Sequence, residues 1–335
     1  MTDRESPEEA VGTAEEDPTR AEAPFEGAPE GTSQPRPRGA LGVLGAIWRG
    51  LNRFRRWSKR WPVFSVSVIV FVLIVPAVFA EFLTPHDPLR GELAKRLMPP
   101  AWMDGGSWEF PLGTDKVGRD MLTRMMYGSR ISLVVSGITI VLGAFLGSTL
   151  GMLAGYFGGV VDRFISWLID TFLSLPYVLL ALVVVAVIGP SFITIIAIIS
   201  ATMWAHFARI SRGETLSVRE KDYVARAKVA GVRSRRILAR YITPNIVNSL
   251  IVLATLQVGA VILMESSLSF IGAGIPRPNP SWGVMVAGGR DNVLTAWWLS
   301  MFPGIAILVV VMALNLFGDW LRDFLDPKLR QREQA

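Results

Sequence analysis

The side chains best suited to chemistry in this sequence lie within or beside apolar segments. Glu265, Ser266 and Ser267 follow one another in the run MESSLSF, and His206 is one of two histidines. A serine nucleophile needs a base within hydrogen-bond reach and donors for the oxyanion. No glycine-flanked nucleophile turn surrounds these serines. The sequence therefore argues against an intramembrane hydrolase.

Ligands for metals and nucleotides are equally scarce. The chain has no cysteine, and His86 and His206 are far apart in the sequence, so we expect no metal site. No phosphate-binding loop of the form GxxxxGK[ST] occurs. We expect no cofactor bound by this chain. If the protein uses ATP, another chain must hydrolyse it.

The composition indicates a membrane protein. Of the 335 residues, 51% are hydrophobic and only 19% are charged. Several stretches of about 20 residues carry almost no charge, which is long enough to cross the hydrocarbon core. The alternating pattern of barrel strands is absent. We therefore predict an all-α, polytopic membrane protein with about six transmembrane helices, at residues 62–83, 131–156, 163–188, 190–209, 246–272 and 298–320.

The remaining segments complete the predicted domain organisation. Residues 1–46 are rich in acidic residues, proline and glycine, so we expect a disordered cytoplasmic tail. Residues 47–61 form a basic, aromatic segment suited to the membrane surface. Residues 84–130 are predicted to be an extracytoplasmic loop. A core of five spans follows at 131–325, with a cytoplasmic loop at 211–245 and a cytoplasmic tail at 326–335.

Charge predicts the orientation. The net charge of +6 and the pI near 9.9 would suggest nucleic acid for a soluble protein. Here the basic residues flank apolar spans, which indicates contact with membrane lipid and no nucleic acid. Between residues 209 and 240 there are ten basic and three acidic residues, so this segment is expected to be cytoplasmic. Both termini then lie on the cytoplasmic side.

Two sets of residues stand out inside the spans. Gly143, Gly147, Gly151 and Gly155 recur every four residues on one helix face, which predicts close helix packing or, alternatively, the lining of a pathway. Polar groups at membrane depth usually face the bundle interior or water. They are therefore candidates for a translocation path, although Glu265 can instead be interfacial and structural; these residues are Asp170, Gln257 and Glu265.

The extracytoplasmic segments carry two further features. The acidic and basic residues of the 84–130 loop predict either a salt-bridged turn or part of a docking surface for another protein; they are Asp115, Arg119 and Asp120. Tryptophan favours membrane–water interfaces, so three tryptophans are expected to anchor the protein there: Trp282, Trp297 and Trp298.

The 211–245 loop is too long for a simple connection between neighbouring helices. Its small residues predict a helix with a close-packing face, then a turn after Gly231, then a second helix that runs until Pro244. Such a helix–turn–helix could dock on a soluble partner, and the alternative is a basic loop lying on anionic lipid. The small residues concerned are Ala225, Ala227, Ala230 and Gly231.

This loop resembles the coupling loop of bacterial ATP-binding-cassette (ABC) importer permeases. The family pattern is Glu-Ala-Ala, three residues, Gly, nine residues, Ile, one residue, Leu-Pro. Ala227, Gly231 and Pro244 match it in identity and spacing. The chain departs from it at Ala225, Arg226, Tyr241 and Thr243. The resemblance makes the following residues candidates for coupling to an ATPase: Glu220, Asp222, Tyr223, Ala225, Ala227, Gly231 and Pro244.

Three more stretches resemble the dipeptide, oligopeptide and nickel branch of that family. They are GTDKVGRDMLTRMMYGSRISL at 113–133, ESSLSFIGAGIPRPNPSWG at 265–283 and NLFGDWLRDFLDPKLR at 315–330, where Trp320 replaces a common glycine. Together with the N-terminal span and the long external loop, they place the chain with the C-type subunit. The resemblance implies a type I importer fold in the bacterial cytoplasmic (inner) membrane.

The resemblance also implies partners and a function. The expected complex contains a second, homologous permease, two ATP-binding subunits or domains that hold ATP and Mg²⁺, and an extracytoplasmic substrate-binding protein. The expected activity is import of dipeptides or short oligopeptides, although relatives in this branch also handle nickel chelates and glutathione. We expect Gly231→Asp or Ala227→Arg to uncouple transport. The alternative is a channel or ion-driven transporter, whose repeated pore-facing polar residues or inverted repeats the sequence lacks.

Overall fold

The computed structural model describes residues 62–325, which form helices joined by loops. Five helices in this range are long and apolar enough to cross a membrane, and a bent helix pair makes a sixth crossing if it counts as one span. The predicted all-α class is confirmed. The predictions for residues 1–46, 47–61 and 326–335 lie outside the described residues.

The helices are as follows, in chain order. The first apolar segment is one continuous helical stretch that contains α2 (Val63–Val68), the π-helix η1 (Ile69–Ile74) and α3 (Val75–Leu83). A short 3₁₀ turn, η2, covers Leu93–Lys95. The rest are α4 (Met121–Phe157), α5 (Gly159–Ser174), α6 (Tyr177–Ile188), α7 (Phe192–Arg219), α8 (Asp222–Val229), α9 (Ser234–Ile237), η3 (Leu238–Ile242), α10 (Thr243–Ile271), α11 (Trp282–Gly289), η4 (Arg290–Asn292) and α12 (Trp298–Leu325).

Two helices extend beyond the apolar stretches that predicted them. α4 begins at Met121, inside the segment expected to be loop, because the Asp120 carboxylate caps its N-terminus. The Asp120 oxygens accept hydrogen bonds from the backbone N–H groups of Leu122 (3.1 Å) and Thr123 (3.2 Å). α7 continues to Arg219, through the first part of the predicted 211–245 loop. Hydropathy locates the apolar part of a helix, whereas capping and packing decide where it ends.

The predicted span at 163–188 is broken. α5 and α6 meet at an angle of 86°. Pro176 has no backbone N–H to donate, and its ring disfavours helical geometry at the preceding residue. Leu175 accordingly takes an extended conformation, with φ −81° and ψ 125°. The chain therefore turns sharply between the two helices.

Pro244 does not end a helix, so that prediction is wrong. The helix runs without interruption from Ser234 to Ile271. A π-helical segment, η3, lies just before Pro244. Its wider hydrogen-bond spacing lets the helix continue although proline has no backbone N–H to donate. The Thr243 hydroxyl donates to the carbonyl of Leu238 at 2.9 Å. The first helical stretch repeats this arrangement, since η1 lies just before Pro76.

The glycines of α4 pack against α7. A Cβ atom at Gly147 would lie 2.2 Å from the Trp204 carbonyl oxygen, and one at Gly151 would lie 2.3 Å from that of Ala208. Gly143 and Gly155 face α7 in the same way. The two backbones therefore approach so closely that no side chain fits between them.

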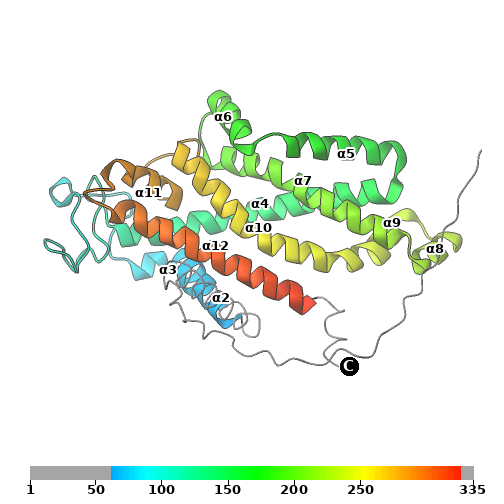
Figure 1. Cartoon of the computed structure of the whole chain (residues 1–335), viewed down its shortest axis with the longest axis horizontal. Helices are drawn as coiled ribbons and strands as arrows, with labels where there is room; N and C mark the ends of the chain where they lie inside the picture. The colour runs from blue at the N-terminus through cyan, green and yellow to red at the C-terminus, as the bar shows by residue number, and fades with distance from the viewer. Residues whose placement is uncertain (1–61, 326–335) are drawn as a thin grey trace, which may run out of the picture. The chain divides into compact units, whose positions relative to one another are not determined.

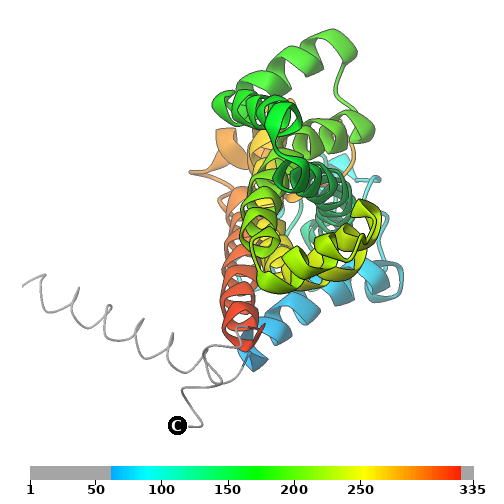
Figure 2. The same cartoon turned by 90° about the vertical axis from the view of Figure 1, so that its right-hand side faces the viewer.

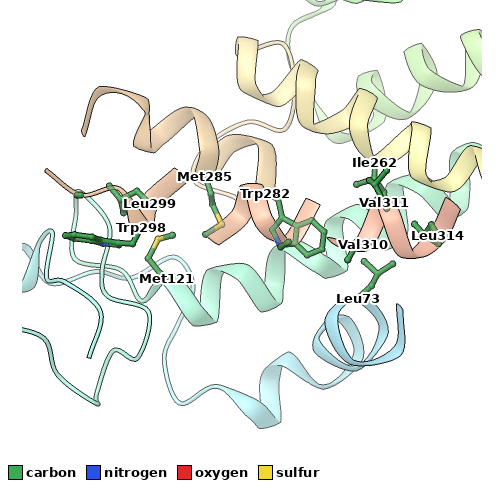
Figure 3. Packing of buried hydrophobic residues seen from close by; sticks show 12 residues of the cluster. Leu73, Met121, Ile262, Trp282, Met285, Trp298, Leu299, Val310, Val311 and Leu314 are labelled. Atoms are coloured by element: carbon green, nitrogen blue, oxygen red, sulfur yellow. The ribbon is translucent and has the colours of Figure 1, made fainter. Parts of the chain in front are cut away.

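Buried aromatic and aliphatic residues fill the end of the bundle that carries α11, as Figure 3 shows. Trp282 is buried, and its indole N–H donates to the Met125 carbonyl at 2.9 Å. Trp298 is also buried, and its N–H donates to the Thr114 carbonyl at 3.3 Å. Their prediction as membrane-interface anchors is wrong, because protein groups satisfy both indoles. Trp297 is half-buried against Phe302.

The helices place different segments at the two ends of the bundle. In Figure 1, α8 and α9 lie at one end, and α11 lies at the other with the loop between α3 and α4. α5 and α6 lie on one side, and α2 and α3 lie on the opposite side (Figure 2). The polar segments at the two ends are therefore separated by the length of α4 and α7.

We predict that Gly147→Ala lowers the stability of the protein. The added Cβ meets the α7 backbone, and overpacking of this kind costs about 1–3 kcal/mol. Gly137→Ala on the same helix is the matched control, because its Cβ would have no neighbour within 4 Å. Thermal unfolding of the detergent-solubilised protein measures the difference. Equal unfolding temperatures for the two variants would show that the contact does not stabilise the fold.

Candidate functional site

A small helical knob, residues 220–237, projects at one end of the bundle between α7 and α10 (Figure 1). Its turn is a Schellman motif. The N–H of Gly231 donates to Lys228 (3.0 Å), and the N–H of Val232 donates to Ala227 (3.1 Å). Gly231 has φ +70°, a conformation that glycine adopts without a steric penalty. The sequence therefore forms a sharp turn at the place where the family pattern has its glycine.

The inner face of the knob packs against the ends of the long helices. Val224 and Ala227 are buried against Tyr156 of α4 and Ile246 of α10. Ala227 is only 7% exposed, so its close-packing face contacts this chain's own helices, and its part in coupling stays a prediction. Tyr223 is half-buried against the same cluster. Ala227→Arg would thus disrupt the knob itself.

The outer face of the knob carries the other candidate residues. Val229 at its tip is 91% exposed. Pro244 is also exposed, but it lies within the long helix that follows. The remaining candidates on the exposed surface are Glu220, Asp222, Ala225 and Gly231.

Polar contacts connect the knob to α4. The Arg219 guanidinium, at the end of α7, donates to the carbonyls of Gly155 (3.1 Å) and Tyr156 (3.0 Å) at the C-terminal end of α4. The Lys228 ammonium lies 5.3 Å from the centre of the Tyr156 ring. In the sequence, Arg219 and Lys228 look like any other basic residues of the 209–240 segment. Cations near a helix C-terminus are a known capping signal, but their partner here is a different helix.

Further contacts fix α7 to α5 and α10. The Arg212 guanidinium forms an ion pair with Asp162 of α5, with one N–H···O distance of 2.8 Å. The Ser249 hydroxyl of α10 donates to Glu214 of α7 at 3.0 Å. α7 therefore holds the knob, α5 and the first turns of α10 in one unit.

The three candidates for a translocation path make separate contacts. Asp170 is exposed on α5 and pairs with Arg209 of α7 at 2.8 Å. The Gln257 side chain of α10 is half-buried and reaches the Met203 sulfur of α7 at 3.5 Å. Glu265 lies near the C-terminal end of α10. No shared polar site forms from these residues.

Glu265 is buried, with an exposed fraction of 0%. Its carboxylate accepts hydrogen bonds from the hydroxyls of Ser269 (2.7 Å) and Ser266 (3.4 Å). Ser269 also accepts from the N–H of Ile275 in the loop after α10, at 3.1 Å. The hydroxyl of Ser281, which caps α11, contacts the same carboxylate. These contacts favour the structural interpretation, in which Glu265 fixes the loop between α10 and α11.

Hydrogen bonds to carboxylates also hold the charged turn before α4 in place. Asp115 accepts from the N–H groups of Val117 (2.9 Å) and Arg119 (3.0 Å), and from the Arg119 guanidinium (2.7 Å). Asp120 is buried and lies 3.4 Å from His86, in addition to capping α4. These contacts favour the salt-bridged turn over a docking surface. No group of three or more potential metal ligands occurs within residues 62–325.

Comparison with known proteins identifies the family. Residues 147–331, more than half of the chain, match the family described as "Binding-protein-dependent transport system inner membrane component". The chain belongs to this family. It is a multi-pass protein of the inner membrane and a transport subunit. The resemblance to ABC importer permeases is confirmed, and a channel or ion-driven carrier is not favoured.

Several curated relatives resemble the chain over most of its length. It is 38% identical over 268 residues to the di/tripeptide transport system permease protein DppC of Pseudomonas aeruginosa, covering 79% of this chain and 88% of the relative. It is 39% identical over 265 residues to the dipeptide transport system permease protein DppC of Haemophilus influenzae, covering 78% and 90%.

A solved structure shows the same fold. The inward-facing MetNI methionine ABC transporter matches with a TM-score of 0.52 at 15% identity, covering 62% of this chain and 98% of that chain. At this identity the match concerns the fold alone.

We predict that Glu265→Ala destabilises the protein and Glu265→Gln does so much less. Removing the carboxylate leaves the buried hydroxyls of Ser269 and Ser281 without this partner, and an unsatisfied buried polar group costs about 1–3 kcal/mol. Gln keeps one acceptor oxygen. Thermal unfolding compares the variants. If Glu265→Gln unfolds like the wild type yet loses uptake, the residue has a direct role in transport and the structural role is insufficient.

Proposed function

We propose that this chain is the membrane-spanning subunit of an ATP-driven importer for dipeptides or short oligopeptides. The observation that carries the proposal is the 38–39% identity to permeases named for dipeptide and di/tripeptide transport, over nearly 80% of the chain. A third relative, the probable D,D-dipeptide permease DdpC of Escherichia coli, is 38% identical over 81% of this chain. The substrate class therefore follows from several relatives.

The proposed complex contains a second, homologous permease, two ATP-binding subunits or domains, and an extracytoplasmic substrate-binding protein. ATP and Mg²⁺ are held by the ATP-binding subunits, and this chain supplies no residue to ATP hydrolysis. Both termini and the knob lie in the cytoplasm. The density of basic residues around the knob supports this orientation. α11 and the loop before α4 then face the extracytoplasmic side.

The knob is proposed to couple ATP hydrolysis to transport. Its exposed face combines the small or apolar residues Val229, Ala225 and Gly231 with basic side chains, and it can enter a cleft on an ATP-binding subunit. Closure of the two ATP-binding subunits would then displace the knob. Arg219 holds the end of α4, so the displacement would reach the α4–α7 pair and the junction with α5. A coupling element must make different contacts in the two states that it connects.

The function is tested by purification and uptake. The tagged chain is extracted gently from native membranes, and the proteins that copurify with it are identified by mass spectrometry. A second permease and an ATP-binding subunit are expected among them. Cells lacking the chain are expected to lose uptake of labelled Ala-Ala and regain it when the chain is restored. Recovery of the chain alone would contradict the ATP-driven assembly. Normal Ala-Ala uptake with loss of nickel-chelate or glutathione uptake would contradict the substrate class.

We predict that Val229→Asp abolishes most uptake while the protein still folds and inserts. The substitution places a charge at an exposed position that makes no core contact, so the free energy of unfolding should change little. Val229→Ala is the matched control and is expected to retain uptake. Uptake of Ala-Ala and the amount of ATP-binding subunit that copurifies are measured for both. Wild-type uptake by a well-expressed Val229→Asp variant would exclude the tip of the knob as a docking element.

A further inference from the structure

A cavity of about 700 Å³ lies at the end of the bundle that carries α11. Most of its lining comes from three parts of the chain: the charged turn with the start of α4, the end of α10 with the following loop, and α11 with η4. Pro190 and Leu299 complete it. Clefts of about 300–1,000 Å³ are the usual size for small-molecule sites. The cavity is therefore large enough for a short peptide.

The lining of the cavity has an excess of positive charge. It contains two carboxylates, Asp115 and Asp291, and five cationic side chains. Arg119 pairs with Asp115 at 2.7 Å, and Lys116 and Arg290 each lie 3.3 Å from Asp291. Lys116 also holds the pKa of the Asp291 carboxyl below its ordinary value, so this group stays ionised and neutralises its neighbours. The cationic side chains are Lys116, Arg119, Arg124, Arg277 and Arg290.

Two of these cations are not fully paired with carboxylates of this chain. Arg124 is only 3% exposed, and its Nε has no hydrogen-bond partner within the described residues. The nearest carboxylate oxygen, on Asp115, lies 3.7 Å from that nitrogen. Arg277 is exposed and forms no ion pair within residues 62–325. Arg124 Nη1 donates to the Pro88 carbonyl at 2.8 Å. Within the same residues, the Arg124 charge is offset only by Asp115, which also pairs with Arg119. An anionic ligand in the cavity would stabilise this incompletely paired charge.

The cavity also has an apolar lining. It includes Ile275, Val284, Met285 and Leu299, and Figure 3 shows Leu299 beside the buried Trp298. Ser269, which Glu265 holds in place, also lines the cavity. A cavity lined by both cationic and apolar side chains suits a small molecule that has a carboxylate and an apolar side chain.

We propose that this cavity is a binding site for the C-terminal carboxylate of the transported peptide, on the extracytoplasmic side of the permease. The exposed Arg277 binds the carboxylate, the nearby Arg124 charge stabilises it, and the apolar lining receives a side chain. Planar guanidinium groups bind carboxylates through two parallel hydrogen bonds, which favours arginine in such a role. This inference rests on the proposed function and adds to it a site in the permease that selects for a free C-terminus.

The absence of cysteine from the chain permits a direct test. Gly288 lines the cavity, and a Cβ added there meets no atom within 4 Å, so Gly288→Cys places one thiol in the wall. The assembled complex in lipid nanodiscs, without ATP or binding protein, is treated with an anionic or a cationic methanethiosulfonate. Labelling of this chain is followed by mass spectrometry. Thr295→Cys, an exposed position outside the cavity, corrects for the different intrinsic reactivities of the reagents.

Relative to Thr295→Cys, the Gly288→Cys thiol is expected to favour the anionic reagent on the order of tenfold, because nearby cations attract it. Adding Arg277→Gln should remove most of this preference. Arg96→Gln, which removes an exposed cation outside the cavity, should not. Ala-Ala at millimolar concentration is expected to slow the labelling of Gly288→Cys, and Ala-Ala amide is not.

The outcomes separate this proposal from the proposed function. Equal protection by Ala-Ala and Ala-Ala amide, or no preference for the anionic reagent, would overturn the carboxylate site even if the complex imports Ala-Ala. Protection by inorganic phosphate but not by Ala-Ala would assign the cavity to a phosphate group and would also overturn it. Failure of the complex to import Ala-Ala would instead contradict the proposed function.

Discussion

The close approach of α4 and α7 is the contact on which the rest of the structure depends. Four glycines on one face of α4 let its backbone meet the carbonyl oxygens of α7 directly. Without a hydrophobic driving force between helices in lipid, such packing supplies much of the association energy. α7 in turn holds the knob, and Arg212 and Arg219 join it to α5 and to the end of α4. Movement of the knob therefore cannot be separated from movement of this helix pair.

The two ends of the bundle use different physical means for different purposes. At the knob, exposed basic and small residues surround a buried cluster that includes Val224, which gives a compact element whose outer face is available to a partner. At the other end, buried polar groups hold the loops beside a hydrophobic cluster. Glu265 fixes the loop after α10, and Asp115 organises the turn before α4. These networks hold loops in place where no regular secondary structure could, and they shape the cavity between them.

The breaks in the helices follow from proline, but in different ways. Pro176 separates α5 from α6 by an 86° bend. Pro244 and Pro76 instead lie within continuous helices, each just after a π-helical segment. Leu175 before Pro176 is extended, whereas the π-helical segments before Pro244 and Pro76 let the helix continue through the proline. Local sequence alone does not distinguish these cases.

The sequence by itself determined the helical class, the number of apolar segments and the family, because these depend on composition, on 20-residue hydropathy and on short motifs such as the one containing Gly231. Only the tertiary structure decided which groups are buried. Ala227 and Trp282 looked accessible in the sequence but lie in the interior. Arg124 and Arg277 belong to segments more than 150 positions apart, and long-range packing brings them to one cavity. Burial and long-range proximity are properties of packing between helices, which no local pattern encodes.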